Sequence, residues 1–328
     1  MSLPTNVLES LYEKMQLVRL SEKQIMKEYF QDEMKTPVHL GIGAEAIATA
    51  VHQACPKDAQ YFGTYRNHAL YLACSNDLDS FFGEMYGKMN GCGKGKAGSM
   101  HMASPEHGLL ATSAVVATTI PVAAGAALTA QYTGSGKVAV CQFGDGAVEE
   151  GVFFETLNFA SLKKLPLLLV CEDNELAIHS TRVERKGFDF FNQMAETFNF
   201  EFADGDGSDA TDVYTKTKDI LARMKESGKP GLLHFKYFRF LEHVGPLEDF
   251  DKGYRTKPKD MIERWDPVPK LYKKCIEGGV SESRLKEIED KLLARIETSV
   301  KLAKATEFPP ARELFTDVFA PEVMKGTH

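Results

Sequence analysis

One aspartate held between two glycines is the first feature of this sequence that could do chemistry. The stretch VAVCQFGDGA, residues 138–147, ends an apolar run with Gly144, Asp145 and Gly146. Open α/β sheets bind ligands at the carboxyl ends of their strands, and glycines let a ligand approach the backbone closely. Asp145 would offer a hard oxygen ligand to a cation at such a place.

A side-chain amide follows at a related position. Asn174, in EDNEL, comes after one predicted helix and one predicted strand. A βαβ crossover brings the carboxyl ends of both strands to one edge of a sheet, so Asp145 and Asn174 should lie together. A carboxylate, an amide and a backbone carbonyl suit Mg²⁺, which keeps positions for phosphate oxygens. An Asp-Gly turn and an unrelated Asn cap would explain either residue alone, but the pair favours a metal–diphosphate site.

Histidines and basic residues in glycine-containing loops form a third group of candidates. A single histidine is more often structural than catalytic, but four of the nine lie in such loops. Arg66, next to Tyr65, is a candidate clamp for a phosphate. The histidines of this group are His39, His68, His101 and His243.

A glycine-rich stretch, GCGKGKAG, imitates a dinucleotide-binding loop. Gly93, Gly95 and Gly98 have the GxGxxG spacing. That fingerprint requires a strand before it and a helix after it, whereas here a helical segment precedes it and SMHM follows. We therefore expect no dinucleotide there, although its two lysines and free backbone would suit an anionic ligand or a mobile loop.

The elements that position these residues alternate between strand and helix. Continuous apolar runs predict parallel strands covered on both faces, and helical periodicity predicts helices between them. The pattern indicates an α/β fold with a doubly wound parallel sheet. The strands are expected at residues 137–143, 165–172 and 231–240, and the helices at 8–18, 118–132, 149–164 and 212–227.

Two other regions stand out. Residues 37–108 are rich in Gly, His and Lys, and we interpret them as long structured loops with short helical pieces, such as DLDSFFGEMYGK at 77–88, that hold a site rather than a core. From residue 261 a helical pattern takes over, with Leu285, Ile288, Leu292, Ile296 and Val300 along one stripe. The predicted units are an α/β domain over 1–260 and a helical extension over 261–328. The stripe could pack on its own domain or on another subunit.

Composition excludes several classes of protein. The net charge of −7 over 328 residues, without a basic stripe, argues against nucleic-acid binding. No apolar run reaches membrane-spanning length, and the first residues resemble neither a signal peptide nor a transit peptide. Six scattered cysteines show no CxxC pair. We expect a soluble protein of a reducing compartment, the cytoplasm.

Several segments of the sequence resemble those of a known family. GTYRNH, GKGKAGSMH, the segment from GDGAVEEG to LLLVCEDN, and EHVGPLEDFDKGYR are similar, in that order, to the alpha subunit of the thiamine diphosphate-dependent dehydrogenase component of 2-oxo acid dehydrogenase complexes. The pyruvate, branched-chain and acetoin types share these segments. The resemblance covers about two-thirds of the chain and implies the thiamine diphosphate-binding fold.

The resemblance also implies roles for individual residues. Mg²⁺ would be held by Asp145, Asn174 and the carbonyl of Leu176. The remaining cofactor contacts would come from His39, Tyr65, Arg66, Val116, Gly146 and Ala147. His101 would lie in a loop facing the active-site funnel.

Partners are implied as well. The glutamate that activates the cofactor belongs to a separate beta subunit in this family, so an α2β2 assembly is expected. The substrate would be a 2-oxo acid, by default pyruvate, and a lipoyl-bearing acyltransferase would accept the acyl product. The chain alone should be nearly inactive.

Several residues depart from the family pattern. Ala44 stands where Gln is common, Asp173 replaces an Asn, and Ala114 and Ala117 lie where relatives tend to carry Gly. Leu241 takes the place of a histidine that approaches the cofactor phosphate in pyruvate dehydrogenases. Because leucine donates no hydrogen bond, we predict that His243 or His179 supplies the proton donor.

Two other functions remain open. GDGAVEEG is also similar to two-chain carboligases of the transketolase type. The departures would also suit a non-catalytic paralogue that keeps the fold, although the presence of Asp145 and Asn174 argues against it. The sequence does not identify the 2-oxo acid, because the pocket would be shared with the beta subunit.

Overall fold

A parallel sheet organises the molecule, and the computed structural model describes residues 3–187, 191–316 and 318. Six strands lie in the order β2-β1-β3-β4-β8-β7, and every neighbouring pair is parallel. Their bounds are β1 Gln60–Thr64, β2 Leu109–Ser113, β3 Ala139–Gly144, β4 Leu167–Asp173, β7 Glu201–Asp206 and β8 Gly231–Lys236. The predicted doubly wound sheet is confirmed.

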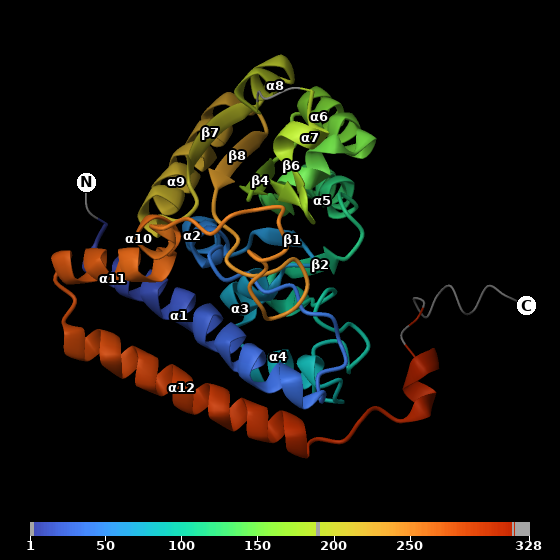
Figure 1. Ribbon diagram of the computed structural model, residues 1–328. Coiled ribbons are helices and arrows are strands. Elements are labelled where there is room, and N and C mark those ends of the chain that lie inside the picture. The colour runs from blue at the N-terminus through green and yellow to red at the C-terminus, as the bar shows by residue number, and fades with distance from the viewer. Residues whose placement is uncertain (1–2, 188–190, 317, 319–328) are drawn as a thin grey trace, which may run out of the picture.

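Helices cover both faces of the sheet (Figure 1). One face packs in a core with α1 (Thr5–Glu28), α2 (Glu45–Ala54), α3 (His68–Ser75) and α9 (Ala210–Ser227). The other packs in a second core with α5 (Thr119–Thr133), α6 (Gly151–Lys163) and α8 (Phe191–Thr197). Successive residues of β4 alternate between the two: Leu168 and Val170 belong to the first core, Leu167 and Leu169 to the second. This alternation explains why the strand sequences are apolar throughout.

The β3-α6-β4 unit matches its prediction except at the start of the helix. Glu149 and Glu150 were expected in its first turn. They instead end a short 3₁₀ helix, η3 (Asp145–Glu149), and cap α6, which begins at Gly151. The α-helix starts later than predicted because the 3₁₀ helix begins at Asp145, directly after β3. Its five residues lie at the edge of the sheet before α6 begins.

Residues 37–108 contain more regular structure than predicted. They include α2, β1, α3, α4 (Leu78–Met85) and η2 (Pro105–His107). Helix α2 is almost entirely buried, and Phe81 and Phe82 of α4 are fully buried. The interpretation of this region as loops around a site was therefore only partly right, because much of it belongs to the first core.

The glycine-rich stretch is not a dinucleotide loop. It follows α4 rather than a strand, residues 99–103 directly after it are not helical, and its backbone is not free. The N–H groups of Gly93, Gly95, Ala97 and Gly98 all donate to the buried Glu84 carboxylate, at 2.7 to 3.0 Å. The anion this loop binds is a side chain of its own protein.

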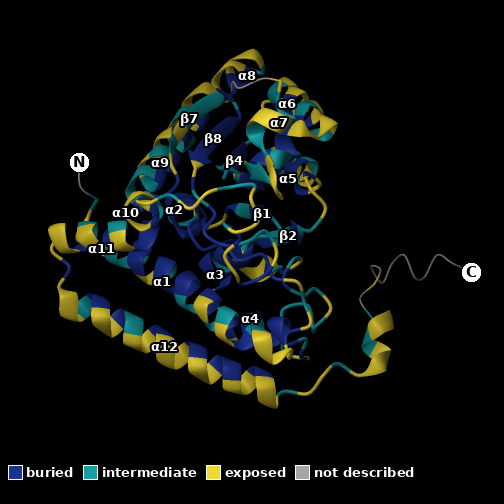
Figure 2. Cartoon of the chain, in the orientation of Figure 1, coloured by how far each residue is buried: buried dark blue, intermediate teal, exposed yellow. Residues whose placement is uncertain are grey.

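Of the last helices of the chain, two pack against the first helix, namely the helices over 267–277 and 282–305. The last helices are α10 (Met261–Trp265), α11 (Pro267–Glu277), α12 (Glu282–Ala305) and the 3₁₀ helix η4 (Ala311–Phe315), and η1 (Tyr29–Gln31) follows α1. The apolar stripe of α12 is buried toward α1 and α4, with its other faces exposed (Figure 2). The stripe therefore packs within the chain. The domain boundary at residue 260 stays a prediction.

The segment after α12 reaches back to the glycine-rich loop. The N–H of Met89 donates to the Glu307 carbonyl at 3.0 Å, and Lys88 Nζ donates to the Thr306 carbonyl at 3.0 Å. Lys96 Nζ donates to the carbonyls of Glu313 and Thr316. Within the described part of the chain, no helix is both long and apolar enough to cross a membrane.

Candidate functional site

A cavity of about 270 Å³ opens at the carboxyl edge of β1, β3 and β4. Parallel strands end together there, and the loops that follow them form its walls. Eight of the residues predicted to bind a cofactor line it: Tyr65, Arg66, Val116, Asp145, Gly146, Ala147, Asn174 and Leu176. The sequence prediction therefore locates this cavity.

Asp145 and Asn174 share this edge because β3 and β4 are paired in register. Gly144 lies opposite Glu172, so the residues that follow each strand leave the sheet side by side. The Asp145 side chain is almost fully buried, and burial raises the pKa of its carboxyl to about 6, with Asp173 adding to the effect and Arg185 opposing it.

The amide of Asn174 is fixed at both ends. Its Oδ1 accepts from the backbone N–H of Leu176 at 3.0 Å, and its Nδ2 donates to the Tyr237 hydroxyl at 2.9 Å. The first bond closes a turn that leads into a small hairpin, β5 (Leu176–Ala177) and β6 (Ser180–Thr181). The turn and hairpin keep Leu176 on the cavity wall.

An arginine that was not predicted reaches Asp145. Arg185, in the short helix α7 (Arg182–Arg185), donates from a terminal nitrogen to Oδ2 of Asp145 at 2.6 Å, and also pairs with Glu149. A capping box of Thr181 and Glu184 starts this helix, and Nε of Arg185 donates to the Ser180 carbonyl. The segment TRVERK contains several basic residues. The sequence alone does not show which arginine contacts Asp145, because this depends on how the hairpin folds.

The oxygen atoms at this position fit a hard divalent cation. They comprise a buried carboxylate, a side-chain amide and backbone carbonyls, and Asp145 already holds one cation, that of Arg185. Among the described residues, no group of three or more His, Cys, Asp or Glu side chains is arranged for a metal. A metal here would depend on Asn174 and a carbonyl, and it would have to displace Arg185.

The surroundings also fit an anionic group. A Cβ on Gly144 would meet nothing within 4 Å, so the backbone there is open to a ligand. Arg66 lines the cavity, and Arg185 and Lys186 lie beside its acidic residues. These cations would balance a diphosphate.

His39 and His243 lie next to Tyr65 but outside the cavity lining. The His39 ring is 4.5 Å from Tyr65 and 5.1 Å from His243, between ring centroids. Burial, with Arg66 next in size, lowers the pKa of His39 to about 3 and that of His243 to about 4, so both rings are neutral at pH 7. Nδ1 of His39 has no hydrogen-bond partner among the described residues.

The structure does not bring the other two predicted catalytic histidines into the cavity lining. His101 is exposed in a bend before β2. His179 is exposed in the turn between β5 and β6, where its ring lies 4.5 Å from that of Tyr254. Their catalytic roles stay predictions.

The side chain of Leu241 packs in the core of the protein. Leu241 is 6% exposed and belongs to the first core. Its carbonyl accepts from Arg239 at 3.1 Å and from Arg255 at 3.0 Å, and both arginines also pair with Asp249. The departure from the family pattern thus replaces a polar group by a core side chain.

Glu172 and Tyr237 are among the lining residues that the sequence prediction missed. Burial raises the pKa of Glu172 to about 7 and that of Tyr237 to about 12. A carboxylate at the end of an apolar strand was a visible signal for Glu172. Tyr237 comes directly after β8, and only the strand order brings it beside Asn174.

Comparisons with known proteins identify the family of the chain. The family model described as dehydrogenase E1 component matches residues 13–312. The chain is similar to a chloroplastic pyruvate dehydrogenase E1 component subunit alpha-3 of Oryza sativa subsp. japonica, 34% identical over 94% of this chain and 75% of the relative. It is also similar to the alpha subunit of an acetoin:2,6-dichlorophenolindophenol oxidoreductase of Bacillus subtilis (strain 168), 30% identical over 94% of this chain and 92% of the relative.

Proposed function

The chain belongs to the dehydrogenase E1 component family, and from this premise we propose that it is the alpha subunit of a thiamine diphosphate- and Mg²⁺-dependent 2-oxo acid dehydrogenase. One observation carries the proposal. Asp145, Asn174 and Leu176, which the family pattern assigns to the metal, line one cavity at the carboxyl edge of the sheet. An oxygen-only set beside an open glycine backbone suits a metal-bound diphosphate.

In this proposal Asp145, Asn174 and the Leu176 carbonyl hold Mg²⁺. Tyr65, Arg66 and the backbone of Gly146 and Ala147 contact the diphosphate, with His39 behind them and Val116 toward the aminopyrimidine. When bound, the cofactor supplies an electron sink for decarboxylation. The residues of this chain bind and orient it.

Proton handling is assigned to histidines. Because the Leu241 side chain donates no hydrogen bond, we propose His243 and His179 as donors, with His101 facing the funnel. Its low pKa leaves His243 neutral at pH 7, able to donate from one ring nitrogen and accept at the other. If His243→Gln combined with His179→Gln left turnover unchanged in the complex with the beta subunit, this assignment would be wrong.

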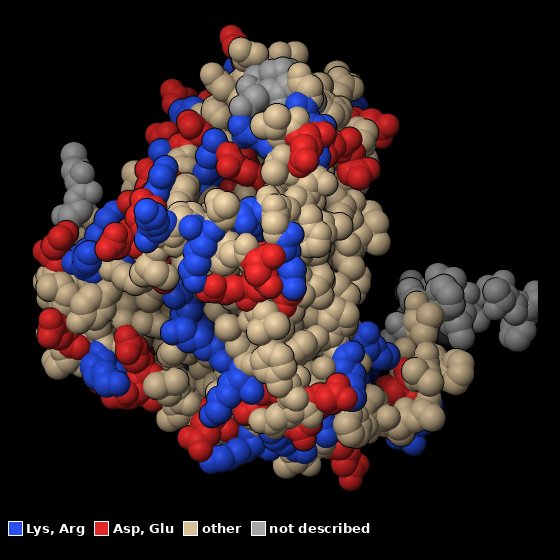
Figure 3. All heavy atoms as spheres, viewed as in Figure 1, with Lys and Arg blue, Asp and Glu red and all other residues tan. Residues whose placement is uncertain are grey.

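A beta subunit is expected to complete the site in an α2β2 assembly. An uncharged area lies over α5 and β2 in Figure 3. Val115, Val116 and Val122, beside the cavity, are 63%, 45% and 51% exposed. Exposed apolar surface beside a site supports a protein partner there. A lipoyl-bearing acyltransferase is proposed as the acyl acceptor.

Pyruvate is the default substrate. Acetoin is a second candidate, because acetoin oxidoreductase subunits are among the relatives. The pyruvate dehydrogenase relatives include that of Porphyra purpurea, 32% identical over 92% of its length. The acetoin oxidoreductase subunits of Bacillus subtilis and Cupriavidus necator match over 92% and 95% of theirs. Product analysis with pyruvate and with acetoin, each with and without a lipoyl acceptor, separates these activities from a carboligase. A cytoplasmic location stays a prediction, since some relatives are named chloroplastic.

Calorimetric titration of thiamine diphosphate with Mg²⁺ tests the proposal, using the chain together with the beta subunit that copurifies. We expect Mg²⁺-dependent binding that Asp145→Asn weakens by about 100-fold. Asp219→Asn, at an exposed ion pair on α9, is the matched control and should bind normally. Absence of binding to the intact complex would favour a non-catalytic paralogue instead.

A further inference from the structure

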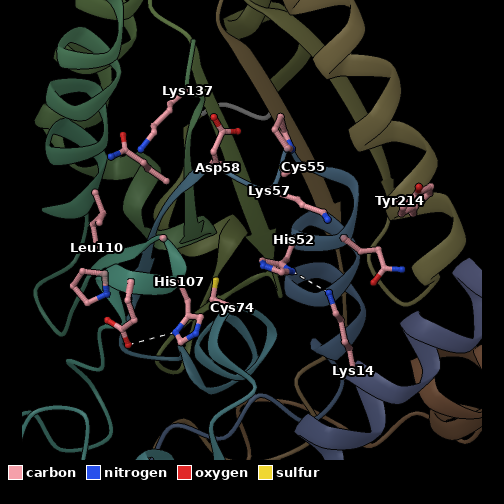
Figure 4. Close-up of a pocket in the computed structure, with 17 residues that line it drawn as sticks. Lys14, His52, Cys55, Lys57, Asp58, Cys74, His107, Leu110, Lys137 and Tyr214 are labelled. Atoms are coloured by element: carbon pink, nitrogen blue, oxygen red, sulfur yellow. Dashed lines mark hydrogen bonds and ion pairs between the residues drawn. The ribbon is translucent and has the colours of Figure 1, made fainter. Parts of the chain in front are cut away.

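A second cavity lies at the opposite edge of the sheet, where the strands begin. It measures about 630 Å³ and is lined by α1, the end of α2, the turn before β1, the end of α3, η2 and Lys137, two residues before β3 (Figure 4). Strand β1 separates the two cavities: Gln60 lines this one and Thr64 lines the candidate site. At about 3.3 Å per residue, they are on the order of 13 Å apart.

A largely buried lysine without an acidic partner lies in this cavity. Nζ of Lys14, from α1, is 3.1 Å from Nδ1 of His52, at the end of α2. Burial, followed by Lys14, lowers the pKa of His52 to about 4, so the ring is neutral at pH 7 and accepts from the ammonium. Among the described residues, Lys14 makes no ion pair with a carboxylate.

Two further lysines line the same cavity. Figure 4 shows Lys57 extending toward His52 from the turn before β1, and Lys137 above them before β3. In the described chain neither has a carboxylate within ion-pair distance. Of the two acidic residues in the lining, Glu106 is engaged by the Ser104 hydroxyl at 2.6 Å and by His107 at 3.4 Å, which leaves Asp58.

We propose that this cavity is a binding site for a small multivalent anion, a polycarboxylate or a phosphorylated metabolite. Three lysines without a carboxylate partner among the described residues line one polar hollow, where they outnumber the two carboxylates of Asp58 and Glu106, in a chain whose net charge is −7. Charge-assisted hydrogen bonds from Lys14, Lys57 and Lys137 would satisfy several anionic oxygens at once. The proposal does not depend on the function assigned to the other edge.

A cation or a thiol reaction explains the cavity less well. Three lysines repel a metal ion, and no His, Cys, Asp and Glu group in the described residues is arranged to hold one. Cys55 and Cys74 line the cavity, but burial raises the pKa of both thiols, that of Cys55 to about 12. Protonated thiols are poor nucleophiles and poor metal ligands.

Calorimetric titrations of citrate and of inorganic phosphate into the full chain with its copurifying partner test the proposal. The two probes separate a polycarboxylate from a phosphate ligand. At least one should bind with a Kd below about 1 mM. Lys14→Met should weaken that binding about tenfold or more, because it removes one charge-assisted bond inside the cavity.

Two variants keep the test interpretable. Lys57 is exposed, so Lys57→Met leaves no cavity in a core. This variant should weaken binding without affecting folding. Lys273→Met, an exposed lysine of α11 outside the cavity, removes the same charge and should bind both probes as the wild type does. The proposal is overturned if neither probe binds, or if Lys273→Met weakens binding as much as Lys14→Met.

Discussion

The two edges of the sheet treat charge in opposite ways. At the carboxyl edge, Asp145 is buried but held by Arg185, so the site carries its own counter-ion. At the amino edge, Lys14 is largely buried against a neutral histidine, and Lys57 and Lys137 have no carboxylate partner in the described chain. A cation must compete with Arg185 for Asp145 at the first edge, whereas lysines outnumber carboxylates in the lining of the second.

The comparison shows how the same strands support two chemistries. Strands of a parallel sheet end in loops whose glycine backbone a ligand can approach, and Gly144 is open in this way. The starts of the strands here are bounded by helix ends and short turns, which contribute long basic side chains instead. In these proposals the carboxyl edge takes a metal together with its diphosphate, whereas the amino edge takes an anion without a metal.

The largest effect should come from a core substitution in the middle of the sheet, because the sheet supports both edges. Leu169, in the middle of β4, is fully buried, and Leu169→Ala should lower the free energy of unfolding by about 3 kcal/mol through lost burial and a cavity. Urea denaturation measures it, and binding at both edges should weaken together. Leu162→Ala, at a leucine 71% exposed on α6, is the control and should change stability by less than about 0.5 kcal/mol.

The second prediction separates the edges. Asp145→Asn should weaken Mg²⁺-dependent thiamine diphosphate binding by about 100-fold, because it removes the charged ligand. Citrate or phosphate binding at the amino edge should stay as in the wild type, since Asp145 does not line that cavity. Calorimetry measures both. A parallel loss at the two edges would show that they are not independent.

The third prediction concerns pH at the amino edge. The pKa of His52 lies near 4 in the folded protein against an ordinary 6.5. Between these values the unfolded chain binds a proton that the folded chain does not, so the free energy of unfolding falls as pH falls from about 6.5 to about 4. His52→Gln should remove on the order of 2 kcal/mol of this dependence.

Urea denaturation at pH 7, 5.5 and 4.5 measures that difference. His107→Gln, at an exposed histidine of the same cavity, serves as the control. Equal pH dependence in the wild type and His52→Gln would contradict the assignment.

The smallest predicted effect is a gain in stability. Without an anion, Lys14→Met should raise the free energy of unfolding by about 1 kcal/mol, because it removes an unpaired, largely buried ammonium. At saturating citrate or phosphate the order should reverse, since the ligand then stabilises the wild type more than the variant. Thermal unfolding with and without the probe measures both, and an unchanged order would count against an anion site.

Sequence reasoning succeeded where structure is local. The strands β3 and β4 were predictable because an uninterrupted apolar run has few other places in an α/β protein, and their pairing then brings Asp145 next to Asn174. It missed β7, an edge strand with the polar sequence EFADGD, and β1, whose five residues include a glycine. Both are strands because of their neighbours rather than their own composition.

The candidate site divides in the same way. Tyr65 and Arg66 follow a strand end directly and line the cavity as predicted. Arg185, His179 and His101 depend on how loops fold back, and spacing along the chain carries little information about that. Lys14 and His52 escaped notice because they lie on two helices whose packing brings them together.

The bond between Met89 and Glu307 sets an order of events during synthesis. The glycine-rich loop leaves the ribosome early, yet its backbone partner is made more than two hundred residues later. Until then, residues 88–96 lack the carbonyls of Thr306 and Glu307 that anchor them. The loop therefore cannot take its final form as the nascent chain emerges, and a fragment that stops at residue 260 would never complete it.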